Sequence, residues 1–324
     1  MTTSYVLALH GGAGTIPRGA GHDEGPYRKA LLEALAAGEA VLAAGGTSLD
    51  AVVETVRALE DCPLFNAGHG AVFNAEGSHE LDAAVMDGRN LAAGGVAAAR
   101  RIRNPVLAAR EVLRTGRSVL LGGEGADRFA EAHGLAMVEP AYFSTPHRHA
   151  QWRRAREMDA QLLDHDAEQA VRSAAERGDD GTSMRGRVGT VGAVALDRQG
   201  HLAAATSTGG MTNKPLGRIG DSPIVGAGVY ANDASCAVST TGTGEHFVRA
   251  CVAHDVHARM RYRSQTLDEA VEATIAEGLE PIGGVGGVIA IDAHGTVVLR
   301  FNSVGMYRAW TREGGRPVAA VFES

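Results

Sequence analysis

The chain has 324 residues, of which 44% are hydrophobic and only 5% aromatic, and its formal net charge is −7. This length allows a large buried core built mainly from Ala, Val and Leu, and the ordinary charge content excludes a disordered chain. We expect no nucleic-acid partner, because the net charge is negative and no basic stripe is visible. We also expect no membrane span, because no apolar run approaches about 18 residues.

The three cysteines, Cys62, Cys236 and Cys251, are far apart, and an odd number is a poor basis for a disulfide framework. They predict small buried thiols in a reducing compartment. The start of the chain has no basic segment, and its apolar run is too short for a signal peptide. These features predict a cytoplasmic protein. Arginine outnumbers lysine by 29 to 2, which by itself says little about chemistry.

The first half of the chain contains short apolar strands and amphipathic helices. Residues 5–9 predict a buried strand that ends in a turn at Gly11, and residues 27–43 have the spacing of a helix. Thr47 or Ser48 is placed to cap a second helix that runs to Leu59. The other predictions are strands at 80–86 and 91–99 joined at Asp87-Gly88, a helix at 105–114, a strand at 118–121, and helices at 125–133 and 149–163.

Residues 164–188 differ from the rest because they are polar, charged and dotted with glycine. We expect a mobile linker here, which is a typical place for a nick. The chain then becomes rich in strands. Hairpins are predicted for residues 190–196 with 201–206 and for 285–291 with 296–301. Helices are predicted between these hairpins, at 245–262 and 267–277.

Thr190 follows Gly189 where the linker meets the first of these strands. The dipeptide alone is also typical of an ordinary strand. A threonine hydroxyl is a weak nucleophile, but a cut between Gly189 and Thr190 would place an α-amino group beside it, and this pair is an established nucleophile and base. The reference pKa of such an amine is about 7.7–8.0, so much of it is neutral at working pH. If the amine were not the base, His10 and His246 would be the next candidates.

Further segments set this threonine in a distinctive context. They are His10-Gly11-Gly12-Ala13-Gly14, Asn66-Ala67-Gly68-His69-Gly70, and the glycine- and threonine-rich stretches at 206–214, 217–223 and 239–245. In this order they resemble the plant-type L-asparaginase/isoaspartyl peptidase family of N-terminal-nucleophile hydrolases, from about residue 7 to about residue 310. The resemblance implies a self-cleaving amidohydrolase that acts on the side-chain amide of asparagine and on β-aspartyl dipeptides, through an acyl-enzyme on Thr190.

The resemblance implies a catalytic role for three further residues. Thr208 ends the strand that pairs with the strand of Thr190, and it would orient the nucleophile; a strand-end threonine that only bonds to the backbone is the alternative. Thr241 and the Gly242 N–H would stabilise the oxyanion. The same segment also reads as the capped start of a helix at Glu245, and both interpretations can hold together.

Arg218 and Asp221 lie three residues apart on a glycine-bounded loop. A guanidinium can grip a carboxylate with two hydrogen bonds, and a carboxylate can hold an ammonium, so the two suit a free amino-acid head group. A simple salt bridge between them is the alternative. The resemblance assigns this pair to substrate binding, together with Gly244 and Asn66.

A structural sodium ion is a further expectation from the resemblance, whereas no cofactor is expected for catalysis. The segment that precedes Asn66 is similar to the family's sodium loop, which uses mostly main-chain carbonyls, and carbonyl oxygens suit a hard cation. One departure is His69, where a small aliphatic residue is common. The matching ligands are Leu59, Glu60, Cys62, Phe65, Ala67 and His69.

Hairpins and paired helices in both halves predict an α+β fold of two antiparallel sheets packed face to face with helices outside. The resemblance implies the same four-layer αββα sandwich. We expect one domain over residues 1–324, built after cleavage by an α-subunit half, 1–189, and a β-subunit half, 190–324. The family's usual (αβ)2 assembly is expected, with a small molecule as substrate.

Other functions find less support in the sequence. The segment at His10 is similar to the oxyanion loop of lipase-like hydrolases, but the G-x-S-x-G elbow is missing, as are dinucleotide and P-loop motifs. His254 and His257 lack a clear third ligand, so a packed or surface pair is favoured over zinc. Glycosylasparaginase, and a non-enzymatic ammonia or amino-acid binding module that uses Arg218 and Asp221 without cleavage, stay open as alternatives.

Overall fold

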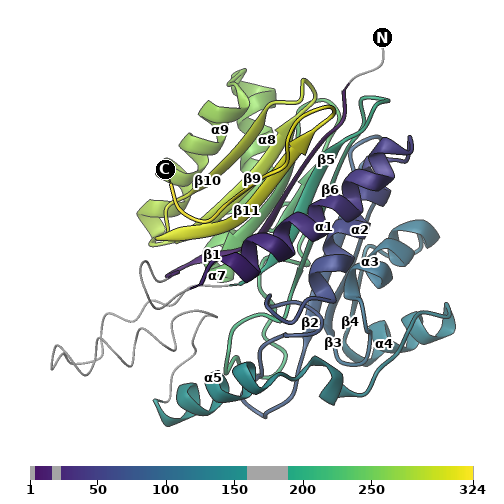
Figure 1. Cartoon of the computed structure of the whole chain (residues 1–324), viewed down its shortest axis with the longest axis vertical. Coiled ribbons are helices and arrows are strands. Elements are labelled where there is room, and N and C mark those ends of the chain that lie inside the picture. The colour runs from purple at the N-terminus through teal and green to yellow at the C-terminus, as the bar shows by residue number, and fades with distance from the viewer. Residues whose placement is uncertain (1–3, 17–22, 159–188, 324) are drawn as a thin grey trace, which may run out of the picture.

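The structure is a computed structural model that describes residues 4–16, 23–158 and 189–323 (Figure 1). The predicted linker at 164–188 and the end of the helix predicted at 149–163 lie outside the described residues. The strands are β1 (Val6–Gly14), β2 (Leu81–Asp87), β3 (Ala93–Ala99), β4 (Leu120–Gly122), β5 (Val191–Leu196), β6 (Leu202–Thr208), β7 (Val229–Ala231), β8 (Cys236–Gly242), β9 (Gly286–Asp292), β10 (Val297–Phe301), β11 (Gly305–Arg312) and β12 (Val318–Ala320).

The helices confirm most of the predicted positions. They are α1 (Gly25–Ala43), α2 (Ser48–Glu60), α3 (Pro105–Thr115), α4 (Gly123–Ala132), α5 (Pro146–Glu157), α7 (Gly244–Ala250), α8 (Val252–Arg263) and α9 (Leu267–Ala273), with shorter turns of 3-10 or π type at Pro140–Phe143, Thr274–Leu279 and Glu280–Ile282. The Thr47 side chain caps α2 by accepting a hydrogen bond from the Asp50 N–H at 3.1 Å. In the described part of the chain, no helix has both the length and the apolarity that crossing a bilayer requires.

Two sheets form the centre of the α+β fold. The larger has the strand order β12-β11-β1-β5-β6-β2-β3-β4, and the smaller has the order β10-β9-β8-β7. The expectation that both sheets are antiparallel is wrong for the larger one, because β3 and β4 pair in parallel. Both predicted hairpins are confirmed, as β5 with β6 and as β9 with β10. The larger sheet contains strands from both sides of residue 189, with β1 inserted between β11 and β5.

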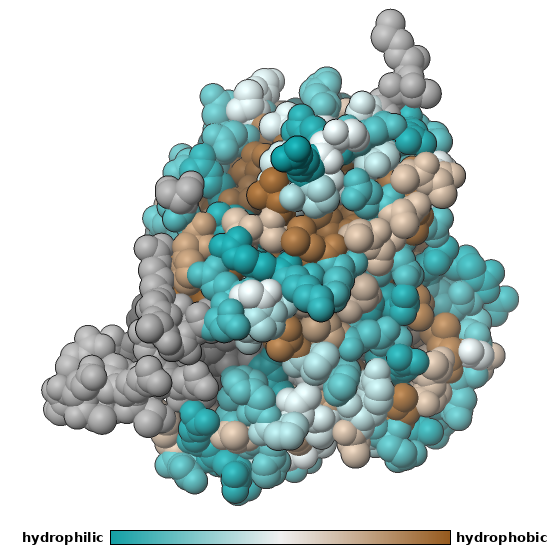
Figure 2. Space-filling model, viewed as in Figure 1, coloured by the Kyte–Doolittle hydropathy of each residue, from teal (hydrophilic) through white to brown (hydrophobic). Residues whose placement is uncertain are grey.

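Both faces of the central strands are buried, which explains why their sequences are apolar without alternation. Leu7 and Leu9 of β1 belong to a core shared with α1, α2 and α3, whereas Val6 and Ala8 belong to a second core that includes residues of β8, β9 and α8. Successive strand residues point to opposite faces, so the two cores lie on opposite sides of β1. Figure 1 shows α1 and α2 on one side of the strands and α8 and α9 on the other. Polar side chains cover much of the face seen in Figure 2, with smaller apolar patches between them.

Three sequence predictions are corrected. The first strand does not end in a turn at Gly11: β1 continues to Gly14 through a bulge between His10 and Gly12. The helix predicted at 245–262 is two helices, broken at Cys251, whose φ of 49° is left-handed. The segment at Thr241 and Gly242 is the end of strand β8 rather than the opening turn of a helix.

Candidate active site

Thr190 lies at the N-terminal end of β5 and is almost fully buried, with 1% of its surface exposed. Its hydroxyl donates a hydrogen bond to the Thr208 hydroxyl, with 3.2 Å between the two Oγ1 atoms. The β5–β6 register explains this contact, because Val191 pairs with Ser207 and the next position outward brings Thr190 and Thr208 together. The structure therefore joins the two threonines that the sequence placed on neighbouring strands.

The Thr208 hydroxyl uses its full hydrogen-bonding capacity. It accepts from the Thr190 hydroxyl and from the Gly210 N–H, the latter at 3.0 Å. It donates to the carbonyl oxygen of Gly189 at 3.5 Å. A hydroxyl has one donor and two acceptor sites, so its orientation is fixed. The chain is continuous through Gly189-Thr190, and Thr208 thus contacts both the hydroxyl and the carbonyl that a self-cleavage would use.

The His10 segment packs directly against this peptide bond. Gly12 has a φ of 109°, and a β-carbon at this position would lie 2.8 Å from the Gly189 α-carbon. Only glycine permits both the left-handed backbone and the close approach. His10 Nδ1 lies 3.0 Å from the Thr190 carbonyl oxygen, and since a carbonyl can only accept, Nδ1 carries the proton.

His10 supports the structure of the site. The sequence suggested it only as an alternative base. Its Nε2 lies 2.9 Å from Ser239 Oγ, and with the proton on Nδ1 this nitrogen accepts from the serine hydroxyl. Burial lowers the pKa of His10 to about 3, so the ring is neutral at working pH. Both nitrogens are engaged, so His10 holds the Thr190 carbonyl in place and has no free lone pair for a proton. Gly192 leaves the room for this contact, because a β-carbon there would lie 2.0 Å from Ser239 Oγ.

The predicted oxyanion residues stand where β8 ends. Thr241 is buried, and its Oγ1 accepts a hydrogen bond from the Ala13 N–H at 3.3 Å. This contact ties the oxyanion candidate to the same glycine-rich segment that covers Gly189. Gly242 is held closely, because a β-carbon would lie 2.2 Å from the Phe247 ring. Both residues are thus held in place at the end of β8.

Arg218, Asp221 and Gly244 converge on one point. A β-carbon at Gly244 would lie 3.0 Å from both Arg218 Nη2 and Asp221 Oδ1. Among the described residues Arg218 Nη2 has no hydrogen-bond partner, although it is buried. An unpaired buried donor is costly, and a carboxylate from outside the chain would satisfy it. The absence of a side chain at Gly244 leaves the space open.

The alternative interpretation, a simple salt bridge between Arg218 and Asp221, does not agree with the structure. No ion pair joins these two described residues; Arg218 Nε bonds instead to Glu245 Oε1 at 2.8 Å, a partner that the sequence did not indicate. Asp221 Oδ2 accepts from the Thr240 hydroxyl at 2.8 Å. Burial raises the pKa of Asp221 to about 6, against the lowering effects of the Thr240 hydrogen bond and of the Arg218 charge.

Asn66 is buried behind this site, and its side chain forms hydrogen bonds within the protein. Its Nδ2 donates to the Gly210 carbonyl at 2.7 Å, and its Oδ1 accepts from the Val72 N–H at 3.0 Å. The Gly209 N–H bonds to the Asn66 carbonyl at 3.0 Å. Asn66 therefore holds the turn at 209–210, whose N–H fixes Thr208.

The loop predicted to bind sodium is closed by its own hydrogen bonds. The carbonyl of Glu60 accepts from the His69 N–H at 2.7 Å, that of Leu59 from the Cys62 N–H at 3.2 Å, and that of Cys62 from the Phe65 N–H at 3.4 Å. The Leu59 carbonyl also accepts from the Asp61 N–H, and the sodium ion stays a prediction. Within the described ranges no three His, Cys, Asp or Glu side chains group as a metal site.

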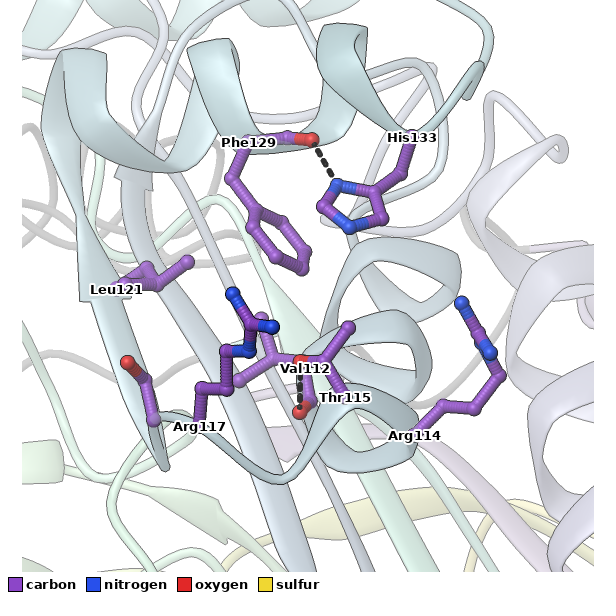
Figure 3. Close-up of a pocket in the computed structure, with 8 residues that line it drawn as sticks. Val112, Arg114, Thr115, Arg117, Leu121, Phe129 and His133 are labelled. Carbon is purple, nitrogen blue, oxygen red and sulfur yellow. Dashed lines mark hydrogen bonds between the residues drawn. The ribbon is translucent and has the colours of Figure 1, made fainter.

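A separate cavity of about 580 Å³ lies beside α3, β4 and α4, away from these residues. Figure 3 shows Phe129 and His133 facing Val112 and Arg117 across it. His133 Nδ1 bonds to the Phe129 carbonyl at 2.8 Å. None of the predicted site residues lines this cavity, so it is not part of the candidate site.

Comparisons with known proteins agree with this geometry. A family model described as asparaginase matches residues 3–320. The isoaspartyl peptidase of Salmonella typhimurium is 51% identical over 98% of this chain and 98% of its own length. That of Escherichia coli is 51% identical over 98% and 96%, respectively. The probable isoaspartyl peptidase/L-asparaginase 2 of Arabidopsis thaliana is 37% identical over 98% and 99%.

Proposed function

Because the chain belongs to the asparaginase family, we propose that it is an isoaspartyl peptidase/L-asparaginase that cleaves itself before Thr190. It hydrolyses the side-chain amide of L-asparagine to aspartate and ammonia, and the β-aspartyl bond of isoaspartyl dipeptides. One observation of the structure carries this proposal: the buried Thr208 hydroxyl bonds to both the Thr190 hydroxyl and the Gly189 carbonyl.

Self-cleavage follows from these contacts. The Thr190 Oγ1 attacks the Gly189 carbonyl carbon, the C–N bond breaks, and the hydroxyl proton passes to the departing nitrogen, so the upstream chain moves from nitrogen to oxygen and the nitrogen becomes an amine. The Thr208 hydroxyl polarises the carbonyl by donating to its oxygen. Water then hydrolyses the ester, which leaves a carboxylate on Gly189 and both a hydroxyl and a free amine on Thr190.

Turnover repeats the attack on a substrate amide. The Thr190 amine takes the hydroxyl proton, Oγ1 forms a bond to the side-chain carbonyl carbon, and ammonia or an amino acid leaves with that proton. Thr241 and the Gly242 N–H stabilise the oxyanion, and loss of one such donor typically costs about 10²–10³ in kcat. Water releases aspartate from the acyl-enzyme.

Arg218 and Asp221 select the head group of the substrate. The buried, unpaired Nη2 of Arg218 suits the α-carboxylate, and the Asp221 carboxylate suits the α-ammonium. A glycan-linked asparagine carries the same head group, so this pair does not separate a glycosylasparaginase from an asparaginase. A binding module without catalysis would need the same pair but would not need the contacts at Gly189-Thr190.

Several further features belong to the proposal. We infer the four-layer αββα sandwich from the cores on the two sides of β1. We infer one domain built by both halves because the larger sheet contains strands from before and after residue 189. We propose the (αβ)2 assembly of the resemblance, and a sodium ion held by the carbonyls of residues 59–69. We also propose a cytoplasmic location. The three cysteines are free thiols, but the prediction that they are buried holds only for Cys236, since Cys62 is partly exposed and Cys251 is exposed.

A denaturing gel of purified protein tests self-cleavage. We expect two fragments, residues 1–189 and 190–324, with the smaller beginning Thr190-Val191-Gly192. Thr190→Ala should stay intact and folded. Arg218→Ala and Asp221→Ala should cleave normally yet lose turnover, because they do not contact Gly189 or Thr190. An intact wild-type chain that hydrolyses asparagine would refute the mechanism. Cleaved wild-type protein that hydrolyses neither asparagine nor isoaspartyl dipeptides would refute the proposed substrates.

A further inference from the structure

A group of buried charges lies under the candidate site and has no part in the chemistry described so far. It consists of Glu80, Asp82 and Lys214, which are 2%, 0% and 0% exposed. Charged side chains are seldom fully buried unless they are paired, so each member needs an explanation. We refer to these three residues as the buried brace.

Lys214 contacts the turn that fixes Thr208. Its Nζ donates to the Glu80 carbonyl at 2.9 Å. Gly210 has a φ of 82°, and a β-carbon there would lie 2.8 Å from both Cδ and Nζ of Lys214. The lysine stem therefore lies against the Gly210 α-carbon, and the Gly210 N–H in turn donates to the Thr208 hydroxyl.

Asp82 stands beside the same threonine on the neighbouring strand. It pairs with Thr208 in the β2–β6 register, and opposite residues in a sheet present their side chains to the same face. Its Oδ1 accepts from the Ala98 N–H at 2.8 Å, whereas its Oδ2 is buried without a hydrogen-bond partner in the described part of the chain. Burial raises the pKa of Asp82, and the Lys214 charge acts against this rise.

Glu80 holds the loop that carries the head-group arginine. Both of its carboxylate oxygens accept from the Gly217 N–H, at 3.2 and 3.0 Å, and Gly217 directly precedes Arg218. The carboxylate also bonds to Arg100 and Asn74. The side chain of Glu80 thus supports the Arg218 loop, while its backbone carbonyl supports Lys214.

The composition of the chain adds weight to Lys214. Only two of its 31 basic residues are lysine, and the other, Lys29, is 77% exposed. Among the described residues Arg148 is also buried, at 1% exposure, but at Lys214 a chain that otherwise uses arginine almost throughout buries a lysine. A compact ammonium on a flexible stem fits against an α-carbon, whereas a planar guanidinium does not.

We propose that the buried brace positions the two parts of the site separately: Lys214 with Asp82 positions Thr208 through Gly210, and the Glu80 carboxylate positions Arg218 through Gly217. This inference rests on the proposed function, because it assigns supports to Thr208 and Arg218 in that reaction. The members are positioning residues, since none of them touches the reacting atoms.

Two single variants give opposite kinetic signatures if this is so. Lys214→Met keeps the stem but removes the ammonium, and we expect slow self-cleavage and a kcat lower by about 10²-fold, the effect of a small misplacement near reacting groups, with KM little changed. Glu80→Gln keeps the backbone carbonyl, and we expect normal self-cleavage, a nearly normal kcat and a KM raised by about tenfold, the size of one weakened charge-assisted hydrogen bond. Lys214→Arg should not restore the rate, and Lys29→Met is the matched control with wild-type values.

Folding is checked separately from activity. Loss of Lys214 leaves buried carboxylates without their cation, so Asp82→Asn with Lys214→Met serves as a second variant if the single variant does not fold; it should fold and still cleave slowly. Near-ultraviolet circular dichroism reports folding in each case. With lysine labelled at its ε-carbon, the two lysines give two NMR signals, and that of Lys214 should titrate below the ordinary range of a lysine, because burial lowers its pKa.

The outcomes separate the brace from the proposed function. Wild-type protein that neither cleaves nor hydrolyses asparagine would refute the proposed function itself. Active wild-type protein with a Lys214→Met variant that cleaves and turns over normally would refute the brace. So would folded variants that both lower kcat and raise KM in parallel, because general loosening rather than separate positioning would explain them.

Discussion

Acidification should weaken substrate binding through Asp221. The carboxylate must be ionised to hold the substrate ammonium, and burial raises the pKa of Asp221 from 3.8 to about 6. Below this pH the carboxyl is protonated and only the ionised fraction of the enzyme binds well. The apparent KM then rises by the inverse of that fraction, about twofold at pH 6 and about 11-fold at pH 5 relative to pH 8. The substrate ammonium keeps its proton through the acid range, because α-amines have a reference pKa of about 7.7–8.0.

The assay is ammonia release from L-asparagine between pH 8 and pH 5, with kcat and KM resolved at each pH. In the bound state the substrate ammonium keeps Asp221 ionised, so kcat should follow the Thr190 amine instead, with an acid limb below about 7.7. Succinamic acid, which is asparagine without its α-amine, is the control substrate: its KM should not rise with the protonation of Asp221. A flat KM for asparagine, or an equal rise for both substrates, would show that Asp221 does not grip the ammonium.

Two further predictions follow from the same electrostatics. Thr240→Val removes the hydrogen bond that lowers the pKa of Asp221, so the midpoint of the KM profile should move to higher pH; an unchanged midpoint would contradict the contact. Burial raises the pKa of Glu60 from 4.5 to about 8. The contribution of this carboxyl to the stability of the folded state is therefore complete below pH 4.5 and is lost as the pH rises from 4.5 through 8. Glu60→Gln should therefore gain stability relative to wild type between pH 5 and pH 8, by at most about 5 kcal/mol, as measured by paired denaturation curves; a constant difference would mean that Glu60 titrates normally.

The sequence predicted correctly the helices and strands with clear apolar spacing. It missed strand β8, which contains several polar residues. Strand β8 contains Ser239, Thr240 and Thr241, which suggest a surface turn, yet all three are fully buried. Tertiary contacts satisfy their hydroxyls: Ser239 bonds to His10, and Thr240 to Asp221. A local sequence pattern does not predict hydrogen-bond partners that lie more than a hundred residues away, as Ser239 does from His10.

The glycines near the start of the chain gave a similar error. A turn was predicted at Gly11, since consecutive glycines usually interrupt a strand. In the structure the left-handed Gly12 is absorbed in a bulge, and β1 continues to pair with β11 on both sides of it. The bulge brings the backbone of Gly12 against Gly189. This close approach also explains why residue 12 is a glycine. The Thr190–Thr208 contact, by contrast, was predictable, because a hairpin register fixes which residues lie opposite each other.

The hydrogen bonds of Thr208 explain how one site can perform two reactions. In the uncut chain its single hydroxyl proton is directed at the Gly189 carbonyl, and Thr190 has an amide nitrogen that cannot act as a base. In the proposed self-cleavage, the nitrogen-to-oxygen shift turns this amide into an amine, and hydrolysis of the ester then converts the Gly189 carbonyl into a carboxylate. The amine would then share the nucleophile Thr190 Oγ1 with the Thr208 hydroxyl, which already contacts that atom. The contacts of His10 with the Thr190 carbonyl and of the Gly210 N–H with Thr208 do not involve the Gly189-Thr190 peptide bond, so under the proposed mechanism the cut would change the chemistry of the nucleophile while these positioning contacts are kept.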